Sequence, residues 1–228
     1  MRSPMGRPAR RPVGRQAGGR VARPVHMAPV PRSAVVAQRD DGPLSRAMGL
    51  LVAGQLPPLP PVLAGTFVTG VLLLLGVAGA DGLAVFAPAV TLLLAGPGST
   101  HPHDGRFDWL VPPILRLIEY TFVAAVGFAH GLHPLLIMVL LGALAFHHYD
   151  LVYRLRERVH PPSWLATAGL GWDGRMMVVS LVALMGPLTV GYTLLALYLW
   201  GLFGWESLTR WLAAPTVRVE ATDARTQD

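Results

Sequence analysis

The chain has 228 residues, of which 52% are hydrophobic and only 14% are charged, well below the roughly 25% charge of a soluble domain. It contains no cysteine, which excludes disulfide frameworks, thiol nucleophiles and cysteine-ligated metal centres. All 19 basic residues are arginine, and ten of them lie between Arg2 and Arg46. This composition predicts an all-α, multi-pass membrane helix bundle whose positive charge is concentrated near its N-terminus.

Residues 1–45 are rich in Arg, Pro, Gly and Ala and show no helical or strand periodicity. Such a segment buries too little apolar surface to fold alone, so we expect a disordered tail. It has no aromatic residue on which a base could stack, so we expect no nucleic-acid partner and instead attraction to anionic lipid. We expect the helix bundle at 46–212 and a second disordered tail at 213–228.

A membrane span needs roughly 17 to 25 apolar residues, and the sequence predicts six. The first four cover 63–80, 83–96, 109–130 and 134–149. The apolar stretch 176–205 would be about 45 Å long as one helix, so we divide it at Gly186-Pro187 into a fifth and a sixth span. One tilted, kinked helix, giving five spans, is the alternative.

The distribution of arginine predicts the orientation. The turns expected at 81–82, 131–133 and 186–187 contain no arginine, whereas the other connections contain several. Under the positive-inside rule, the N-terminus is cytoplasmic and the protein lies in the inner or plasma membrane.

The connection between the second and third spans is the first candidate site. Eight residues contain two histidines, two aspartates and one arginine: His101, His103, Asp104, Arg106 and Asp108. On a helix, Asp104 and Asp108 would share a face, as carboxylates that hold Mg²⁺ or Mn²⁺ would need to do. The alternatives are zinc bound through His101 and His103, or a polar turn at the membrane surface.

Two ionisable residues, Arg116 and Glu119, lie within the third span. Charges at that depth are costly unless they are paired or line a wet cavity. They are three residues apart on one helical face, so we expect either a mutual ion pair or part of a substrate or ion path.

Further polar residues gather where the fourth span ends and the fifth begins. They are His147, His148, Asp150, Arg154, Arg156, Asp173 and Arg175. The arginines, together with Arg106, could bind phosphate or a lipid headgroup. Alternatively, those at the helix end serve only to orient the helix during insertion. Asp173 is a candidate cap for the fifth span.

The chain contains no Gly-x-Ser-x-Gly, P-loop or His-Glu-x-x-His motif, which argues against serine hydrolases, NTPases and zincins. Several segments resemble an uncharacterised actinobacterial membrane domain that accompanies nucleotidyltransferase and CDP-alcohol phosphotransferase regions in larger proteins. They are RDDGPLSR (39–46), GQLPPLPP (54–61), GRFDWLVPPILRLIEY (105–120), FHHYDLVYRLRERV (146–159) and GWDGRMM (171–177). The resemblance covers residues 39–212.

The layout is also similar, more distantly, to the membrane domain of CDP-alcohol phosphotransferases. That resemblance implies a divalent-metal site, and Asp104 and Asp108 keep one of its Asp-x3-Asp spacings. The Ala-Arg half of the motif has no counterpart, and Pro112 stands where a further carboxylate would follow Asp108.

We therefore expect a degenerate module of phospholipid metabolism that binds anionic headgroups, a partner synthase or a second copy of itself. The alternatives are an active transferase that uses a CDP-linked donor with Asp104 and Asp108 on the metal, and a small transporter.

Overall fold

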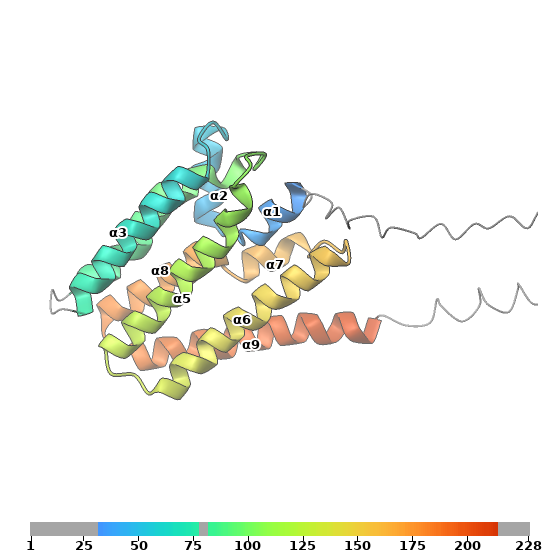
Figure 1. Cartoon of the computed structure of the whole chain (residues 1–228). Helices are drawn as coiled ribbons and strands as arrows, with labels where there is room; N and C mark the ends of the chain where they lie inside the picture. Colours follow the sequence, from blue (N-terminus) through green and yellow to red (C-terminus); the bar gives the residue numbers. More distant parts are fainter. Residues whose placement is uncertain (1–31, 78–81, 214–228) are drawn as a thin grey trace, which may run out of the picture.

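The computed structural model describes residues 32–77 and 82–213, and this part of the chain is helical, without strands (Figure 1). Six helical segments are long and apolar enough to cross a membrane, which confirms the predicted multi-pass bundle with six spans. The turn expected at Asp81-Gly82 falls partly outside the described residues, because Asp81 is not among them.

Four of the spans are built on one long helix each. They are α3 (Leu59–Val77), α5 (Val111–Ala129, preceded by the short 3-10 turn η3, Asp108–Leu110), α6 (Pro134–Arg156) and α9 (Leu188–Ala213). α5 packs against α3, α6 and α8, and its side chains Leu115, Phe122 and Val126 are fully buried. Outward positions such as Phe67 and Leu74 on α3 are apolar and exposed, as expected of helices that face lipid.

The second and fifth spans are interrupted helices. The second consists of η1 (Leu83–Phe86), α4 (Ala87–Ala95) and η2 (Gly96–Thr100). The fifth consists of α7 (Ser163–Ala168) and α8 (Gly171–Met185). The break between α7 and α8 has two consecutive residues with positive φ, Leu170 at 66° and Gly171 at 61°.

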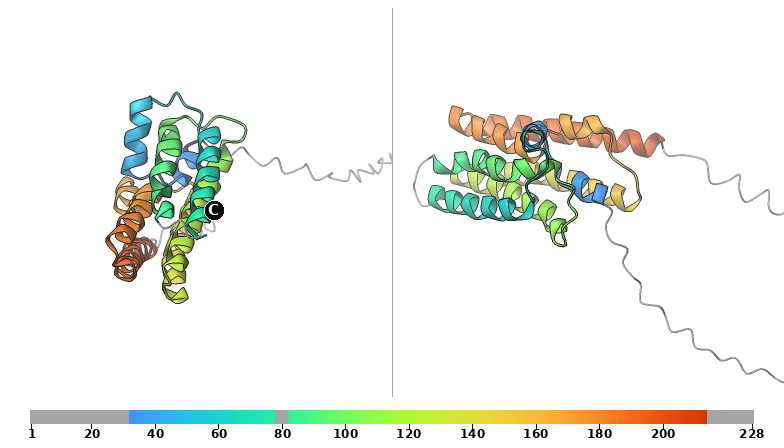
Figure 2. Two further views of the ribbon diagram at one scale, coloured as in Figure 1. Left: turned by 90° about the vertical axis from the view of Figure 1, so that its left-hand side faces the viewer. Right: turned by 90° about the horizontal axis from the view of Figure 1, so that it is seen from above.

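The polar connections lie toward one end of the bundle. The two ends of the described chain lie at that end together with α1 and α7, whereas the last residues of α3 and the turns after α5 and α8 lie at the opposite end (Figures 1 and 2). This is the arrangement that an even number of spans requires. It gathers side chains that are far apart in the sequence, from residue 39 to residue 206.

The segment before the first span corrects one expectation. Residues 32–45 were expected to be disordered, but they include the helix α1 (Arg32–Gln38) and the start of α2 (Pro43–Val52). Val35 is buried, as are the three charged residues Arg39, Asp40 and Asp41. The segment is ordered because its charges have partners inside the bundle, a tertiary effect that composition does not reveal. Residues 1–31 lie outside the described part.

Candidate functional site

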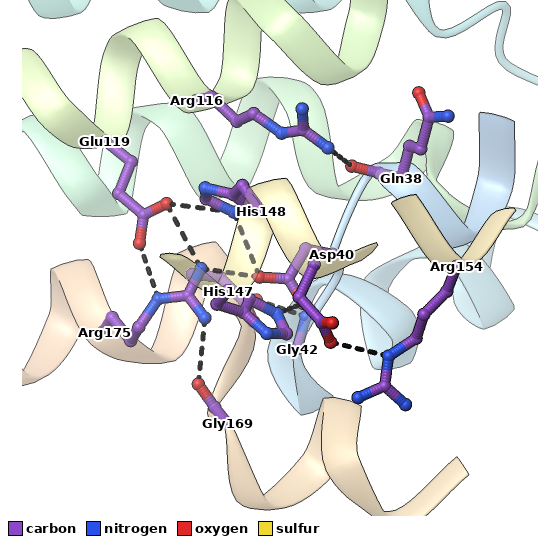
Figure 3. Close-up of polar contacts among 12 residues, drawn as sticks. Gln38, Asp40, Gly42, Arg116, Glu119, His147, His148, Arg154, Gly169 and Arg175 are labelled. Carbon is purple, nitrogen blue, oxygen red and sulfur yellow. Dashed lines mark hydrogen bonds and ion pairs between the residues drawn. The ribbon is translucent and has the colours of Figure 1, made fainter. Parts of the chain in front are cut away.

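A buried ionic network joins the N-terminal segment to the bundle (Figure 3). Arg175, in the first turns of α8, donates from Nε to Glu119 Oε1 at 2.6 Å and from Nη2 to Asp40 Oδ2 at 2.7 Å. Its Nη1 donates to the carbonyl of Gly169 at 3.0 Å. One guanidinium thus links two carboxylates from separate parts of the chain. Such pairs persist in a low-dielectric interior only when their hydrogen bonds are satisfied.

Two adjacent histidines of α6 extend this network around Asp40. His147 Nε2 lies 3.2 Å from Asp40 Oδ1, and His148 Nε2 lies 3.4 Å from Asp40 Oδ2. His148 Nδ1 also lies 2.7 Å from the hydroxyl of Tyr120. Asp40 therefore has polar partners on both of its oxygens.

Asp40 remains ionised at neutral pH. Burial alone would raise the pKa of this carboxyl, but Arg175, His147 and His148 favour the charged form and hold its pKa well below its usual range. The charge of Asp40 is consequently a permanent part of the network.

A second set of contacts surrounds the neighbouring residues. Arg39 Nε donates to Asp41 Oδ2 at 2.7 Å, and Trp172 Nε1 donates to Asp41 Oδ1 at 2.8 Å. Arg39 Nη1 lies 3.2 Å from His103 Nε2. Burial, with the nearby Arg39 charge, lowers the pKa of His103, so this ring is neutral at physiological pH.

Asp173 performs a different role from the one expected. It was expected to cap its own helix, but its carboxylate accepts from Gly42 N at 2.6 Å and from Ser45 N at 2.9 Å. It therefore caps α2, which has no side-chain cap at Gly42 itself. Backbone approaches backbone closely here: a Cβ on Gly171 would overlap the backbone of Gly42.

A cavity of about 590 Å³ lies beside the network. Its polar lining consists of Asp40, Asp41, Arg46, Ser99, Thr100, His147 and Ser163, and its apolar lining includes Val36, Ala37, Leu151, Leu165 and Ala166. The volume is within the range of small-molecule sites, about 300–1,000 Å³. A lining that combines charged and aliphatic groups suits an amphiphilic ligand.

Comparison with known proteins assigns the chain to a family. Residues 31–226 match the family of unknown function DUF5941. The chain belongs to this family. No curated protein and no solved structure matches the chain. The DUF5941 match includes the contacts of Arg175 and of Asp41 and the whole cavity lining.

Within this DUF5941 domain, two arginines expected to bind headgroups are engaged elsewhere. Arg154 and Arg175 are both buried. Arg154 donates from Nε to Asp150 at 2.6 Å and contacts Glu206 of α9 through both terminal nitrogens, and Arg210 pairs with Asp150 as well. The expectation of headgroup contact is therefore wrong for these two residues, because internal carboxylates occupy their donors. Arg106 and Arg156 are exposed, and a headgroup role for them stays a prediction.

The two charged residues of the third span, Arg116 and Glu119, do not pair with each other. Glu119 is fully buried and pairs with Arg175 rather than with Arg116. Arg116 Nη2 donates instead to the carbonyl of Gln38 at 3.2 Å. Both charges thus attach the span to other segments, and the prediction of a mutual ion pair is wrong.

The connection at 101–108 retains a candidate cation site. His101, Asp104 and Asp108 each offer a ligand atom, and these atoms lie within 4.8 Å of one another. The two aspartates do not share a helical face, because residues 101–107 form a loop and Asp108 opens η3. His103 lies against Arg39, so the paired-histidine zinc arrangement does not form.

Sequence reasoning gave no role to Arg39, Asp40, Asp41 or Arg46. A signal was available, since Asp40 and Asp41 are the first acidic residues of the chain and follow nine arginines. Adjacent acids at the end of a basic segment and before a Gly-Pro turn are unusual enough to predict a buried contact.

Proposed function

We propose that this protein is a membrane-embedded module of phospholipid metabolism that binds the headgroup of an anionic phospholipid in the cavity beside Asp40. The observation that supports it is the amphiphilic lining. Arg46 is exposed and is the one guanidinium on that lining among the described residues, whereas Leu151, Leu165 and Val36 offer apolar surface. A phosphate at Arg46 would leave the first part of an acyl chain against these aliphatic side chains.

The position of the cavity supports the same proposal. Its lining comes from α1, α2, η2, α6, α7 and the connections that precede α2 and α7. These parts of the chain meet toward the polar end of the bundle (Figure 2), where headgroups are found in a bilayer. We place this end in the cytoplasm, because the exposed arginines lie there and the turns at 131–133 and 186–187 have none. Membrane-impermeant labelling of a single cysteine introduced at His160 or at His133, both exposed, tests this orientation.

Replacement of Arg46 by Gln should weaken lipid binding without affecting the fold. A hydrogen bond to a charged group contributes about 1.5–3 kcal/mol, so we expect binding of phosphatidylglycerol to weaken by at least about tenfold. The measurement is native mass spectrometry of the full chain in neutral detergent with added lipid. Arg158→Gln is the matched control, because Arg158 is also exposed but does not line the cavity. Equal losses in both variants would contradict the proposal.

A second candidate function is an active transferase, favoured by the grouping of His101, Asp104 and Asp108. Carboxylate oxygens suit Mg²⁺ or Mn²⁺, which would bind the phosphates of a CDP-linked donor while an acceptor hydroxyl displaces CMP. The resemblance to CDP-alcohol phosphotransferases suggests this chemistry.

This candidate predicts Mn²⁺- or Mg²⁺-dependent release of CMP from CDP-diacylglycerol by the full chain in vesicles. Asp104→Asn should abolish the release, because it removes one of the candidate metal ligands. Asp104 is exposed, so this change should spare the fold. Glu157→Gln, also at an exposed position, should retain it. The absence of release from the wild type with every CDP-alcohol would remove the candidate.

The transporter alternative and the partner expectation stay predictions. The residues that suggested transport, Arg116 and Glu119, have structural partners, which lowers their value as markers of an ion path. A partner synthase or a second copy of the chain would contact the same polar end.

A further inference from the structure

The polar part of the cavity is richer in hydrogen-bond acceptors than binding of a phosphate alone would require. Two carboxylates, Asp40 and Asp41, share the lining with Arg46. A bare phosphate would gain from more donors and would be repelled by the carboxylates. The lining therefore indicates a ligand that carries hydrogen-bond donors in addition to its negative charge.

The acceptors can be counted from their contacts. A carboxylate oxygen has two lone-pair positions. Asp40 Oδ1 has one protein partner, His147 at 3.2 Å, and Asp41 Oδ2 has one, Arg39 Nε at 2.7 Å. Each of these oxygens consequently retains acceptor capacity.

Hydroxyl groups around the cavity add to this capacity. Ser99 and Thr100 donate to the carbonyls of Ser45 and Gly49, at 2.8 Å in each case. Their hydroxyl oxygens keep lone pairs. Ser163 contributes a further hydroxyl from an exposed position on the lining.

The donor on the ligand need not be positively charged. Asp40 is paired with Arg175 and Asp41 with Arg39, so the protein already offsets both negative charges. An ammonium group would bring a third positive charge next to these two guanidiniums. Neutral hydroxyl groups satisfy the remaining acceptors without that repulsion.

We propose that the cavity selects anionic phospholipids whose headgroup is a polyol, with the phosphate at Arg46 and the hydroxyl groups against Asp40, Asp41 and Ser163. This inference rests on the proposed headgroup binding and names its ligand class. The aliphatic lining at Leu151 and Leu165 then takes the start of an acyl chain, which separates a lipid from a free polyol phosphate.

The test is isothermal titration of the full chain, in neutral detergent, with short-chain lipids of one acyl composition. Dioctanoyl phosphatidylglycerol and phosphatidylinositol should bind at least about fivefold more tightly than phosphatidic acid and phosphatidylserine, which is the contribution of about one hydrogen bond. Phosphatidylethanolamine and glycerol phosphate should bind more weakly still, because the first has no net charge and the second has no acyl chain.

Two variants at exposed positions keep the test independent of folding. Ser163→Ala should reduce the preference for the polyol lipids, whereas Thr167→Ala, on the same helix but outside the cavity lining, should retain it. Equal affinity for all four anionic lipids would overturn the polyol inference and leave headgroup binding intact. Tightest binding of phosphatidylserine or phosphatidylethanolamine would also overturn it in favour of ammonium recognition. No binding of any lipid would remove the proposed function as well.

Discussion

Replacement of Arg175 by Met should destabilise the bundle by about 3–5 kcal/mol, the range found when one partner of a buried ion pair is removed. The reason is that Arg175 serves two carboxylates at once. Asp40 and Glu119 would both remain buried, each without its guanidinium. The measurement is equilibrium unfolding of the purified protein in mixed micelles with an increasing fraction of dodecyl sulfate.

A matched control and a second substitution define this result. Arg156→Met removes an exposed arginine and should change stability by less than about 0.5 kcal/mol. Adding Glu119→Gln to Arg175→Met should recover part of the loss, because it removes one of the two stranded charges. An Arg175→Met protein as stable as Arg156→Met would mean that this ionic network does not stabilise the bundle.

Replacement of Gly171 by Ala should detach the N-terminal segment from the bundle. Two effects combine at this residue. Its φ of 61° is left-handed, which costs roughly 1–2 kcal/mol for a residue with a Cβ. The new Cβ would also overlap the nitrogen and Cα of Gly42, where Asp173 caps α2. The two backbones would have to separate, and the contacts of Asp40 and Asp41 depend on that approach.

Limited trypsin digestion with mass spectrometry detects this detachment. Arg39 is 1% exposed, so the wild-type chain should resist cleavage after Arg39, whereas Gly171→Ala should be cut there. Gly131→Ala provides the control, because Gly131 has a similar φ of 68° and no atom within 4 Å of its added Cβ. That variant carries the backbone strain without the overlap and should leave Arg39 protected. If Gly171→Ala is equally protected, the close approach has no structural importance.

The sequence was sufficient to predict the number of spans, because their signal is local, although the fifth span begins at Ser163 rather than at residue 176. A run of apolar residues must cross the hydrocarbon core as a helix whatever its neighbours are, and Gly186-Pro187 marks the last division. The interruption at Leu170-Gly171 was missed. It depends on how α8 approaches Gly42, which is a contact across about 130 residues of sequence.

The candidate site was predicted only in part. Glu119 was singled out because an ionisable residue within a span is costly, and His147 and Arg175 because polar residues gather where the fourth span ends and the fifth begins. Their partners could not be assigned, since spacing predicts neighbours along one helix and the actual contacts join different helices. Asp40 was missed for the opposite reason. It lies in a segment whose composition resembles disorder, and only the carboxylate's burial beside Arg175 reveals its place.

Photo-crosslinking of a bound lipid tests the central claim most directly. The full chain would be reconstituted with phosphatidylglycerol that carries a diazirine near the start of one acyl chain, irradiated, digested and mapped by mass spectrometry. We expect labels on cavity residues such as Val36, Leu151 and Leu165, reduced in Arg46→Gln and unchanged in Arg158→Gln. Labels spread over the exposed faces of α3 and α9, with none in the cavity and no effect of Arg46→Gln, would contradict it.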